Sequence, residues 1–341
     1  MQRAPDFAWA LIGPGSIAHR FADAVQRLPG TRLHSVCGRD PLRAAAFARQ
    51  WSCEGKPAPV VARDLSVMLA DDRIDAVYIA TPHASHAEGI RRCLEAGKAV
   101  LCEKPLVTHL PQAQALVALS RDRDVFLMEA LWTRFLPVYG TVRRWLASGA
   151  IGAVQSIQSS FCFTAPFDPH SRLFDPALAG GTLLDIGIYN VAMTRCVLES
   201  QLGACPPVEH LGAQAVLAPT GVDQRVAATL VFHGGAVAQF VCAVDGHADN
   251  ALHISGERGH IELRGNFWEA TEAGLYPPGL PPEQAHAPLR INGFEGEIEE
   301  TMHCVRAGLI ESPTMPHAET LAIVASLDAL RRAIGVHYPF E

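Results

Sequence analysis

The residues best placed for chemistry include Lys104, which lies between an acid and a proline in the sequence Glu103-Lys104-Pro105. The apolar run AVLC at residues 99–102 predicts a short buried strand directly before them. In an open parallel sheet, ligands bind at the carboxyl ends of strands, so Lys104 is expected to project into a crevice. A charged surface loop is the alternative interpretation. The isomer of the Lys104–Pro105 bond is left open by the sequence, although the cis form is possible.

A second set of polar side chains is expected on a helix that follows the sequence GGT at residues 180–182. Asp185 and Tyr189 are four residues apart, so their side chains should share one face of this helix. A phenol and a carboxylate on one face could accept a proton and bind a hydroxyl group. The structural alternatives are a core position for Tyr189 and a capping role for Asp185.

A glycine-rich turn near the N-terminus predicts a dinucleotide-binding site. Gly13, Gly15 and Ala18 fit the pattern GxGxx(G/A) between an apolar run at residues 8–12 and a helical pattern. Gly13 would allow the turn, Gly15 the approach of a pyrophosphate, and Ala18 the packing of helix on sheet. Ser16 and Ile17 would begin the helix, whose unpaired amides and dipole favour an anion. An ordinary glycine turn is the alternative.

The end of the second expected strand indicates the type of cofactor. An NAD-selective site places an acid there, whereas this chain has Gly38 followed by Arg39. Arg39 and Arg43 could supply planar donors to a 2′-phosphate, which favours NADP. Asp40 is the counterargument, because it could turn toward the ribose. NAD therefore stays possible.

Further candidates for the cofactor site follow the apolar strand expected at residues 76–80. Thr81, His83 and His86 come directly after it, and Glu103 ends the next strand. All four would lie at the same carboxyl edge, where cofactor or substrate binds. A metal pair at His83 and His86 lacks a third ligand at a recognisable spacing, so no metal site is expected.

The order of elements predicts the fold class. In the first part, apolar runs alternate with helical patterns up to a sixth strand at residues 125–129, which indicates a doubly wound parallel sheet. In the second part, alternating runs between Gly, Pro and Asp turns predict a mostly antiparallel sheet. We therefore expect an α/β nucleotide-binding domain at residues 1–129 and an α+β domain at residues 130–341. The expected strands of the second domain cover residues 154–163, 211–217, 225–232, 236–244, 252–255 and 260–263.

Composition limits the possible partners and the cellular compartment. The 341 residues include 28 Lys and Arg against 35 Asp and Glu, and the net charge of −7 disfavours nucleic acid and anionic membranes. The nine cysteines, with no CxxC pair, suggest reduced thiols rather than disulfides. Neither a secretory signal nor an apolar run long enough to span a membrane is recognisable. A cytoplasmic protein is expected.

Three stretches resemble a known family. The glycine turn at residues 13–15, the sequence Glu103-Lys104-Pro105 and the strand ending at Glu129 resemble the glucose-fructose oxidoreductase, inositol dehydrogenase and rhizopine-catabolism (Gfo/Idh/MocA) family. Residues 100–106, 126–135 and 180–189 are most similar to its dimeric dihydrodiol dehydrogenases, which also oxidise D-xylose. The resemblance implies an open antiparallel sheet in the second domain and a homodimer, or a higher homo-oligomer, formed through its uncovered face.

The resemblance also implies a reaction. It places the helix of Tyr189 against the nicotinamide, with a hydride removed from a secondary carbinol of a vicinal diol or sugar. We expect Tyr189 to accept the hydroxyl proton while Lys104 orients the substrate oxygen and favours the phenolate. The reverse assignment stays open. Asp185 is expected to bind a second hydroxyl or Lys104.

Further candidates for substrate contact are Trp132, Arg134 and Phe163. For Trp132 and Arg134 the alternatives are a packing anchor and a salt bridge. Three other functions stay open: an NAD-dependent sugar or inositol dehydrogenase of the same family, a non-catalytic regulatory protein that keeps the nucleotide fold, and a glycosidase-like enzyme that uses the oxidised cofactor without net reduction.

Overall fold

The computed structural model describes residues 6–53 and 56–341 and divides the chain into two compact units. The first, the nucleotide unit, contains the chain up to Trp132 together with Arg290–Ala322. The second, the sheet unit, contains Thr133–Leu289 and Ile323–Glu341. The first division therefore lies three residues beyond the expected boundary at 129, and residues 290–322, which the sequence placed in the second domain, pack with the first.

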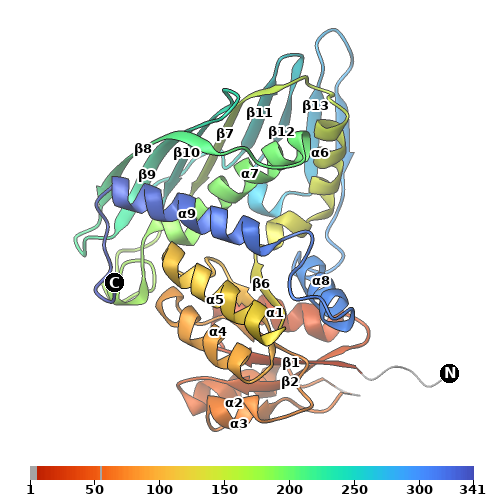
Figure 1. Cartoon of the computed structure of the whole chain (residues 1–341), viewed down its shortest axis with the longest axis vertical. Helices are drawn as coiled ribbons and strands as arrows, with labels where there is room; N and C mark the ends of the chain where they lie inside the picture. The colour runs from red at the N-terminus through yellow and green to blue at the C-terminus, as the bar shows by residue number, and fades with distance from the viewer. Residues whose placement is uncertain (1–5, 54–55) are drawn as a thin grey trace, which may run out of the picture. The chain divides into compact units, whose positions relative to one another are not determined.

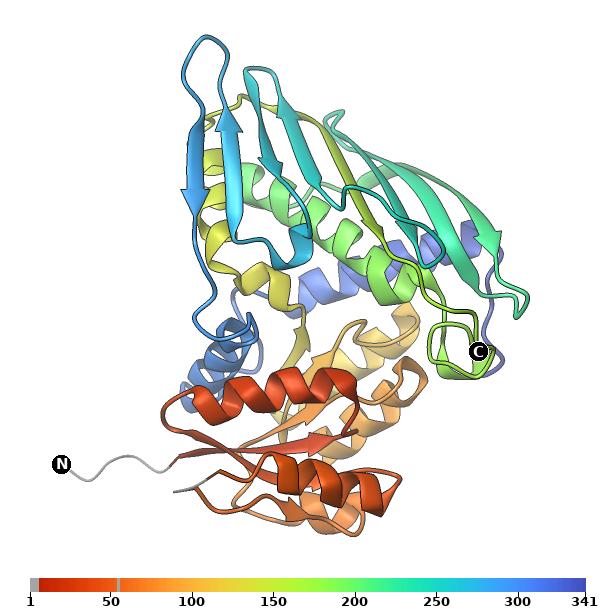
Figure 2. The ribbon, with the colours of Figure 1, turned by 180° about the vertical axis from the view of Figure 1, so that it is seen from behind.

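The nucleotide unit is built on a six-stranded sheet in which every neighbouring pair is parallel. The strand order β3-β2-β1-β4-β5-β6 is that of a doubly wound dinucleotide-binding fold and confirms the predicted fold class. Helices cover both faces: α4 and α5 pack together in front in Figure 1, and α1 lies on the opposite face in Figure 2. The strands are β1 (Phe7–Ile12), β2 (Thr31–Cys37), β3 (Val60–Val61), β4 (Ala76–Ile79), β5 (Ala99–Glu103) and β6 (Leu127–Ala130). The helices are α1 (Ser16–Arg27), α2 (Pro41–Gln50), α3 (Leu65–Leu69), α4 (His86–Glu95) and α5 (Leu110–Arg123).

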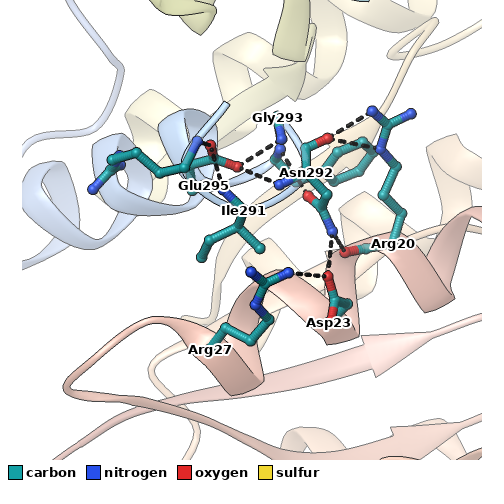
Figure 3. Close-up of polar contacts among 9 residues, drawn as sticks. Arg20, Asp23, Arg27, Ile291, Asn292, Gly293 and Glu295 are labelled. Carbon is teal, nitrogen blue, oxygen red and sulfur yellow. Dashed lines mark hydrogen bonds and ion pairs between the residues drawn. The ribbon is translucent and has the colours of Figure 1, made fainter. Parts of the chain in front are cut away.

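The segment that returns to the nucleotide unit is anchored on α1, the helix after the glycine turn (Figure 3). Arg20 donates from Nε and Nη2 to the carbonyl oxygen of Asn292 at 2.9 and 2.6 Å. The Asn292 amide donates in turn to the carbonyl of Arg20 at 2.8 Å and to Asp23 Oδ2 at 2.9 Å. These reciprocal bonds fix the entry to α8 (Glu295–Arg306), which packs against α1.

Glu295 makes this loop rigid from within. Its carboxylate accepts hydrogen bonds from four successive backbone N–H groups, those of residues 290–293, the shortest being 2.6 Å from Gly293. Burial acts to raise the pKa of Glu295, but the N–H donors outweigh it and hold this pKa below its usual value. The loop is therefore a preformed surface for α1.

The sheet unit contains an eight-stranded sheet in the order β14-β13-β12-β11-β7-β10-β9-β8. All neighbouring pairs are antiparallel except β7 and β10. α6 and α7 pack on one face, and among the described residues no helix covers the other face (Figures 1 and 2). This confirms the predicted open, mostly antiparallel sheet. The strands are β7 (Val154–Cys162), β8 (Val208–Leu217), β9 (Asp223–Phe232), β10 (Val237–Ala243), β11 (Leu252–Gly256), β12 (Gly259–Leu263), β13 (Glu272–Tyr276) and β14 (Glu283–His286). The helices are α6 (Pro137–Ala147) and α7 (Ile188–Leu202), and α9 (His317–Ala333) runs from the nucleotide unit into the sheet unit.

All six predicted strands of the second part are present, each within a few residues of its expected ends. β13 and β14 were not predicted. All nine cysteines are free thiols. None of the helices in the described part of the chain is both long enough and apolar enough to cross a membrane.

Candidate active site

The glycine turn has the geometry that a dinucleotide requires. Gly13 has φ +88°, and a Cβ at this position would lie 2.8 Å from the carbonyl carbon and oxygen of Ala80. Gly15 is the N-cap of α1, without a side-chain cap and with no acid in the first turn. Ser16 and Ile17 are exposed, whereas Ala18 is fully buried against the sheet. Open amides at a helix N-terminus suit a pyrophosphate, so the residues present fit the predicted cofactor.

The residues that follow β2 are arranged around a second glycine. A Cβ at Gly38 would lie 2.8 Å from Cδ of Pro14, so contact with the glycine turn itself excludes a side chain there. Asp40 caps α2, its Oδ1 accepting from the N–H groups of Leu42 at 2.9 Å and Arg43 at 3.2 Å. This carboxylate is therefore committed to the helix. Arg39 and Arg43 are exposed.

Lys104 occupies a turn at the carboxyl end of β5, and its peptide bond to Pro105 is cis. Lys104 is partly exposed, whereas Glu103 before it is 6% exposed. The Tyr78 hydroxyl makes a short hydrogen bond to Glu103 Oε1, and the Lys104 N–H lies 3.3 Å from Glu103 Oε2. Burial, reinforced by the Glu103 charge, raises the pKa of Tyr78 well above its usual value, so the phenol stays protonated and donates.

Thr81, His83 and His86 follow β4 at the same edge. His86 is fully buried, with Nδ1 2.9 Å from the carbonyl oxygen of Pro105 and Nε2 2.9 Å from that of Thr81. The sequence offered His86 as a cofactor contact or as a residue of the helix start that packs the turn. His86 is the first residue of α4 and both of its ring nitrogens face backbone carbonyls, which fits the second interpretation. His83 is partly exposed, and its ring centroid lies 5.7 Å from that of His86. Within the described residues, no group of three or more potential metal ligands occurs.

Trp132 and Arg134 lie in internal contacts. The Trp132 ring packs against Phe294, and the Arg20 guanidinium lies 4.3 Å from its centroid, a cation–π contact within the nucleotide unit. Arg134 is 2% exposed and forms an ion pair with Glu199 within the sheet unit. Both arrangements fit the packing alternatives rather than substrate contact.

The segment that carries Asp185 and Tyr189 is not a uniform α-helix. Residues Leu183–Gly187 form a π-helical turn, and α7 begins at Ile188. A π turn is wider than an α-helical turn, and such turns are frequent at functional sites. Asp185 is 5% exposed and accepts a hydrogen bond of 2.7 Å from the exposed Arg172. The sequence did not predict this ion pair.

Tyr189 lies in an aromatic cluster of the sheet unit. Its ring centroid is 5.6 Å from that of Phe161, which stacks on Trp268 with parallel planes. Phe163, predicted to contact substrate, is partly exposed, with its ring 6.4 Å from Phe161. Trp268 was missed, because it follows the expected strands in a short turn without a periodic pattern.

The nucleotide unit thus brings together the glycine turn, Thr81, His86, Glu103 and Lys104 at one sheet edge, and the sheet unit brings Tyr189 close to Phe161. The strand order and the open helix N-terminus define a dinucleotide-binding oxidoreductase fold. Family models agree with this class. Residues 7–131 match the oxidoreductase family with an NAD-binding Rossmann fold, and residues 139–262 match the GFO/IDH/MocA C-terminal domain. The chain belongs to the GFO/IDH/MocA oxidoreductase family and is an NAD(P)-dependent dehydrogenase of small molecules.

The relatives by sequence cover almost the whole chain. Trans-1,2-dihydrobenzene-1,2-diol dehydrogenase from Mus musculus is 33% identical over 338 residues, covering 97% of this chain and 98% of the relative. The Homo sapiens protein of that name is also 33% identical, over 344 residues, with the same coverage.

Solved structures give the same fold. KijD10, a 3-ketoreductase from Actinomadura kijaniata in complex with NADP and TDP-benzene, has a TM-score of 0.85 at 27% identity, covering 96% of this chain and 98% of that one. The aldose-aldose oxidoreductase from Caulobacter crescentus, complexed with glycerol, has a TM-score of 0.83 at 24% identity, with coverage of 96% and 97%. At that identity the second likeness shows the fold alone.

Proposed function

We propose that this chain oxidises a secondary carbinol of a vicinal diol or a sugar, of the trans-dihydrodiol or D-xylose type, with NADP as the preferred cofactor. The names of the relatives support a diol substrate, and the ketoreductase complex supports NADP. In the overall reaction a CH–OH group loses a hydride and a proton and becomes a carbonyl. The oxidised nicotinamide cofactor supplies the hydride acceptor.

The observation that carries the proposal is the position of Lys104. In the sheet, β1, β4 and β5 are neighbours, so the glycine turn and Lys104 lie at the same carboxyl edge. Lys104 is the partly exposed residue of a turn in which Glu103, Pro105 and Leu106 are buried. A cationic amine at the edge of a dinucleotide fold is suited to orient a substrate oxygen.

Tyr189 is proposed to accept the hydroxyl proton, with Lys104 orienting the oxygen, and the reverse assignment is the alternative. The Asp185–Arg172 pair is proposed to bind a second hydroxyl of the substrate, because it offers an acceptor and a donor 2.7 Å apart. The partly exposed Phe163 would contribute an apolar contact.

The preference for NADP rests on the residues after β2. The carboxylate of Asp40 caps α2, so the acid that could have bound the ribose of NAD is already engaged. The exposed guanidinium groups of Arg39 and Arg43 form no ion pair with another described residue. Both could donate to a 2′-phosphate.

The test is a spectrophotometric assay of dihydrodiols, pentoses and cyclitols with NADP and with NAD. Lys104→Met and Tyr189→Phe are expected to lower kcat by about a hundredfold or more, with the Kd for NADP within about twofold. The double variant should lose little more than either single variant if the two residues act on one proton transfer. Tyr276→Phe, at a tyrosine stacked on His260 in β12, is the matched control and should keep wild-type turnover.

The outcomes separate the candidate functions. Turnover of sugars or cyclitols with NAD alone would replace the proposal by an NAD-dependent sugar or inositol dehydrogenase. Cofactor binding without turnover of any compound would favour a regulatory protein. Wild-type kcat in both single variants would reject the roles of Lys104 and Tyr189.

A further inference from the structure

The turn that carries Lys104 is held by three ionisable side chains from three different elements. The Lys104 N–H faces Glu103 Oε2 of β5 at 3.3 Å. The carbonyl oxygen of Pro105 faces His86 Nδ1 of α4 at 2.9 Å, and the N–H of Leu106 donates to Glu129 Oε1 of β6 at 2.7 Å. Each residue of the turn is therefore fixed by a backbone contact to a titratable group.

These three ionisable side chains lie inside the protein. His86 is 0% exposed, Glu129 is 1% exposed and Glu103 is 6% exposed. Glu129 is paired with Cys102 in the β5–β6 register, so it lies on the strand next to the one that leads into the turn. Solvent does not compete with these contacts, which makes each hydrogen bond stronger than it would be at the surface.

Of the three, Glu129 makes the shortest contact. Neutral imidazole has a single N–H, and burial lowers the pKa of His86, so His86 can donate to only one of its two carbonyl neighbours. The Leu106 N–H, by contrast, donates to a carboxylate oxygen, Oε1 of Glu129, at 2.7 Å. A backbone donor bonded to an ionised carboxylate is about twice as strong as a neutral pair.

The charges around Glu129 come from three directions. Burial raises the pKa of Glu129 to about 7, while hydrogen bonds from the Leu106 N–H and the Thr320 hydroxyl, and then the Lys104 charge, act to lower it. Glu319 from the first turn of α9 acts to raise it further. The Cys102 thiol is also adjacent, and burial keeps its pKa well above the usual value, so it stays neutral.

We propose that Glu129 is a positioning residue for Lys104, since its carboxylate holds the Leu106 N–H from inside the sheet and fixes the place at which the Lys104 amine is presented. When Glu129 is ionised, its charge also attracts the Lys104 ammonium. When it is protonated, both the charge-assisted hydrogen bond and this attraction weaken. The inference rests on the proposed function only in giving Lys104 a part in the reaction.

The first test measures the turn without cofactor or substrate. The amide chemical shift of Leu106 in 15N-labelled protein is followed from pH 5 to pH 9. In the wild type it should titrate with a midpoint near the pKa of Glu129, about 7, and in Glu129→Gln it should not respond in this range. Because this measurement needs no turnover, its result stands even if the proposed function is wrong.

The second test measures the consequence for catalysis. Glutamine keeps the size of Glu129 and an oxygen for Leu106 but removes the charge. Glu129→Gln should lower kcat at pH 8 by about ten- to hundredfold, with the KM for NADP within about twofold, because a small displacement of a reacting group has effects of this size. The wild-type kcat is expected to fall below pH 7 as Glu129 is protonated, and this fall should be smaller in Glu129→Gln.

Glu297→Gln is the matched control, since Glu297 is a fully buried carboxyl group of the same unit without a hydrogen bond to the turn. It should keep both the Leu106 titration and kcat within about twofold. The inference is overturned if the Leu106 shift is flat in the wild type, if Glu129→Gln retains wild-type kcat and pH profile, or if Glu297→Gln abolishes the titration.

Discussion

The carboxyl group of Asp223 accepts a hydrogen bond of 2.6 Å from the N–H of Leu183, the first residue of the π turn that leads to Asp185 and Tyr189. Asp223 is 1% exposed, at the start of β9. Burial raises its pKa to about 7, although the N–H groups of Leu183 and Thr182 act to lower it. The start of the proposed catalytic helix is therefore held by a group that titrates near neutrality.

This raised pKa predicts a pH dependence of stability. An unfolded aspartate titrates near pH 3.9, so between about pH 4 and pH 7 the folded protein binds more protons at this site than the unfolded chain. The contribution of Asp223 to the free energy of unfolding should fall by about 1.4 kcal/mol per pH unit in that window and stay constant above it.

Asp223→Asn removes this titration. Calorimetry of both proteins at pH 5, 6, 7 and 8 should show the Tm of the wild type falling, relative to the variant, by about 2 °C per pH unit up to pH 7. Parallel Tm profiles would show that Asp223 titrates alike in the folded and unfolded chains.

Gly181 is expected to tolerate no side chain, because it lies directly against the buried carboxyl group of Asp223. It has φ +122°, and a Cβ would lie 2.4 Å from Asp223 Oδ1, so Gly181→Ala combines backbone strain with a clash against a buried group. Denaturant unfolding should show a loss of more than about 3 kcal/mol. Gly203→Ala is the control, because Gly203 also has positive φ, +80°, but open space around it, and should lose about 1 kcal/mol. Equal losses would rule out a special role for the Gly181–Asp223 contact.

The cofactor preference can be tested at the start of α2. Arg39→Ala and Arg43→Ala should each raise the KM for NADP by about ten- to hundredfold, since a hydrogen bond to a charged group contributes about 1.5–3 kcal/mol, and leave the KM for NAD unchanged. Arg49→Ala, an exposed arginine in the last turn of the same helix, should change neither constant. Equal effects on NADP and NAD would argue against a 2′-phosphate site.

The open face of the sheet unit is expected to form a homodimer. It carries a hollow of about 790 Å³ lined by residues from five strands, among them Gln158, Thr229 and Val241. Val241→Arg places a charge on this face, where Val241 is 39% exposed, and should convert a species of twice 36.7 kDa into a monomer in light scattering. Val61→Arg, at a valine of similar exposure in β3, is the control and should stay dimeric. A wild-type monomer would refute the expectation.

The sheet of the nucleotide unit could be predicted because β1, β4 and β5 are apolar runs, each followed within two residues by a glycine or a polar residue, and helical patterns separate them. β13 and β14 could not, because Gly274 interrupts the first and the second has the polar sequence EQAH. They are strands because each pairs with its neighbour in the sheet, which is a long-range property.

The residues of the candidate site also fall into two groups, those that the local sequence indicates and those that only the tertiary structure reveals. Lys104 and the glycine turn stand at strand ends and could be found from local sequence. Glu129, which binds the Leu106 N–H beside Lys104, and Asp223, which binds the Leu183 N–H before Tyr189, are remote in sequence from their partners, and no local pattern indicates these hydrogen bonds. The capping role of Asp40 had a local signal, because an aspartate before a proline at a helix start is a typical N-cap.

The return of residues 290–322 to the nucleotide unit has a consequence for the order of folding during synthesis. As the ribosome extends the chain from its N-terminus, the first 132 residues emerge without the loop that Arg20 and Asp23 bind. The α1 face that receives α8 stays uncovered until the whole of the 133–289 segment has been translated. A nascent chain stalled before residue 290 should therefore be more sensitive to protease in α1 than one released after residue 322.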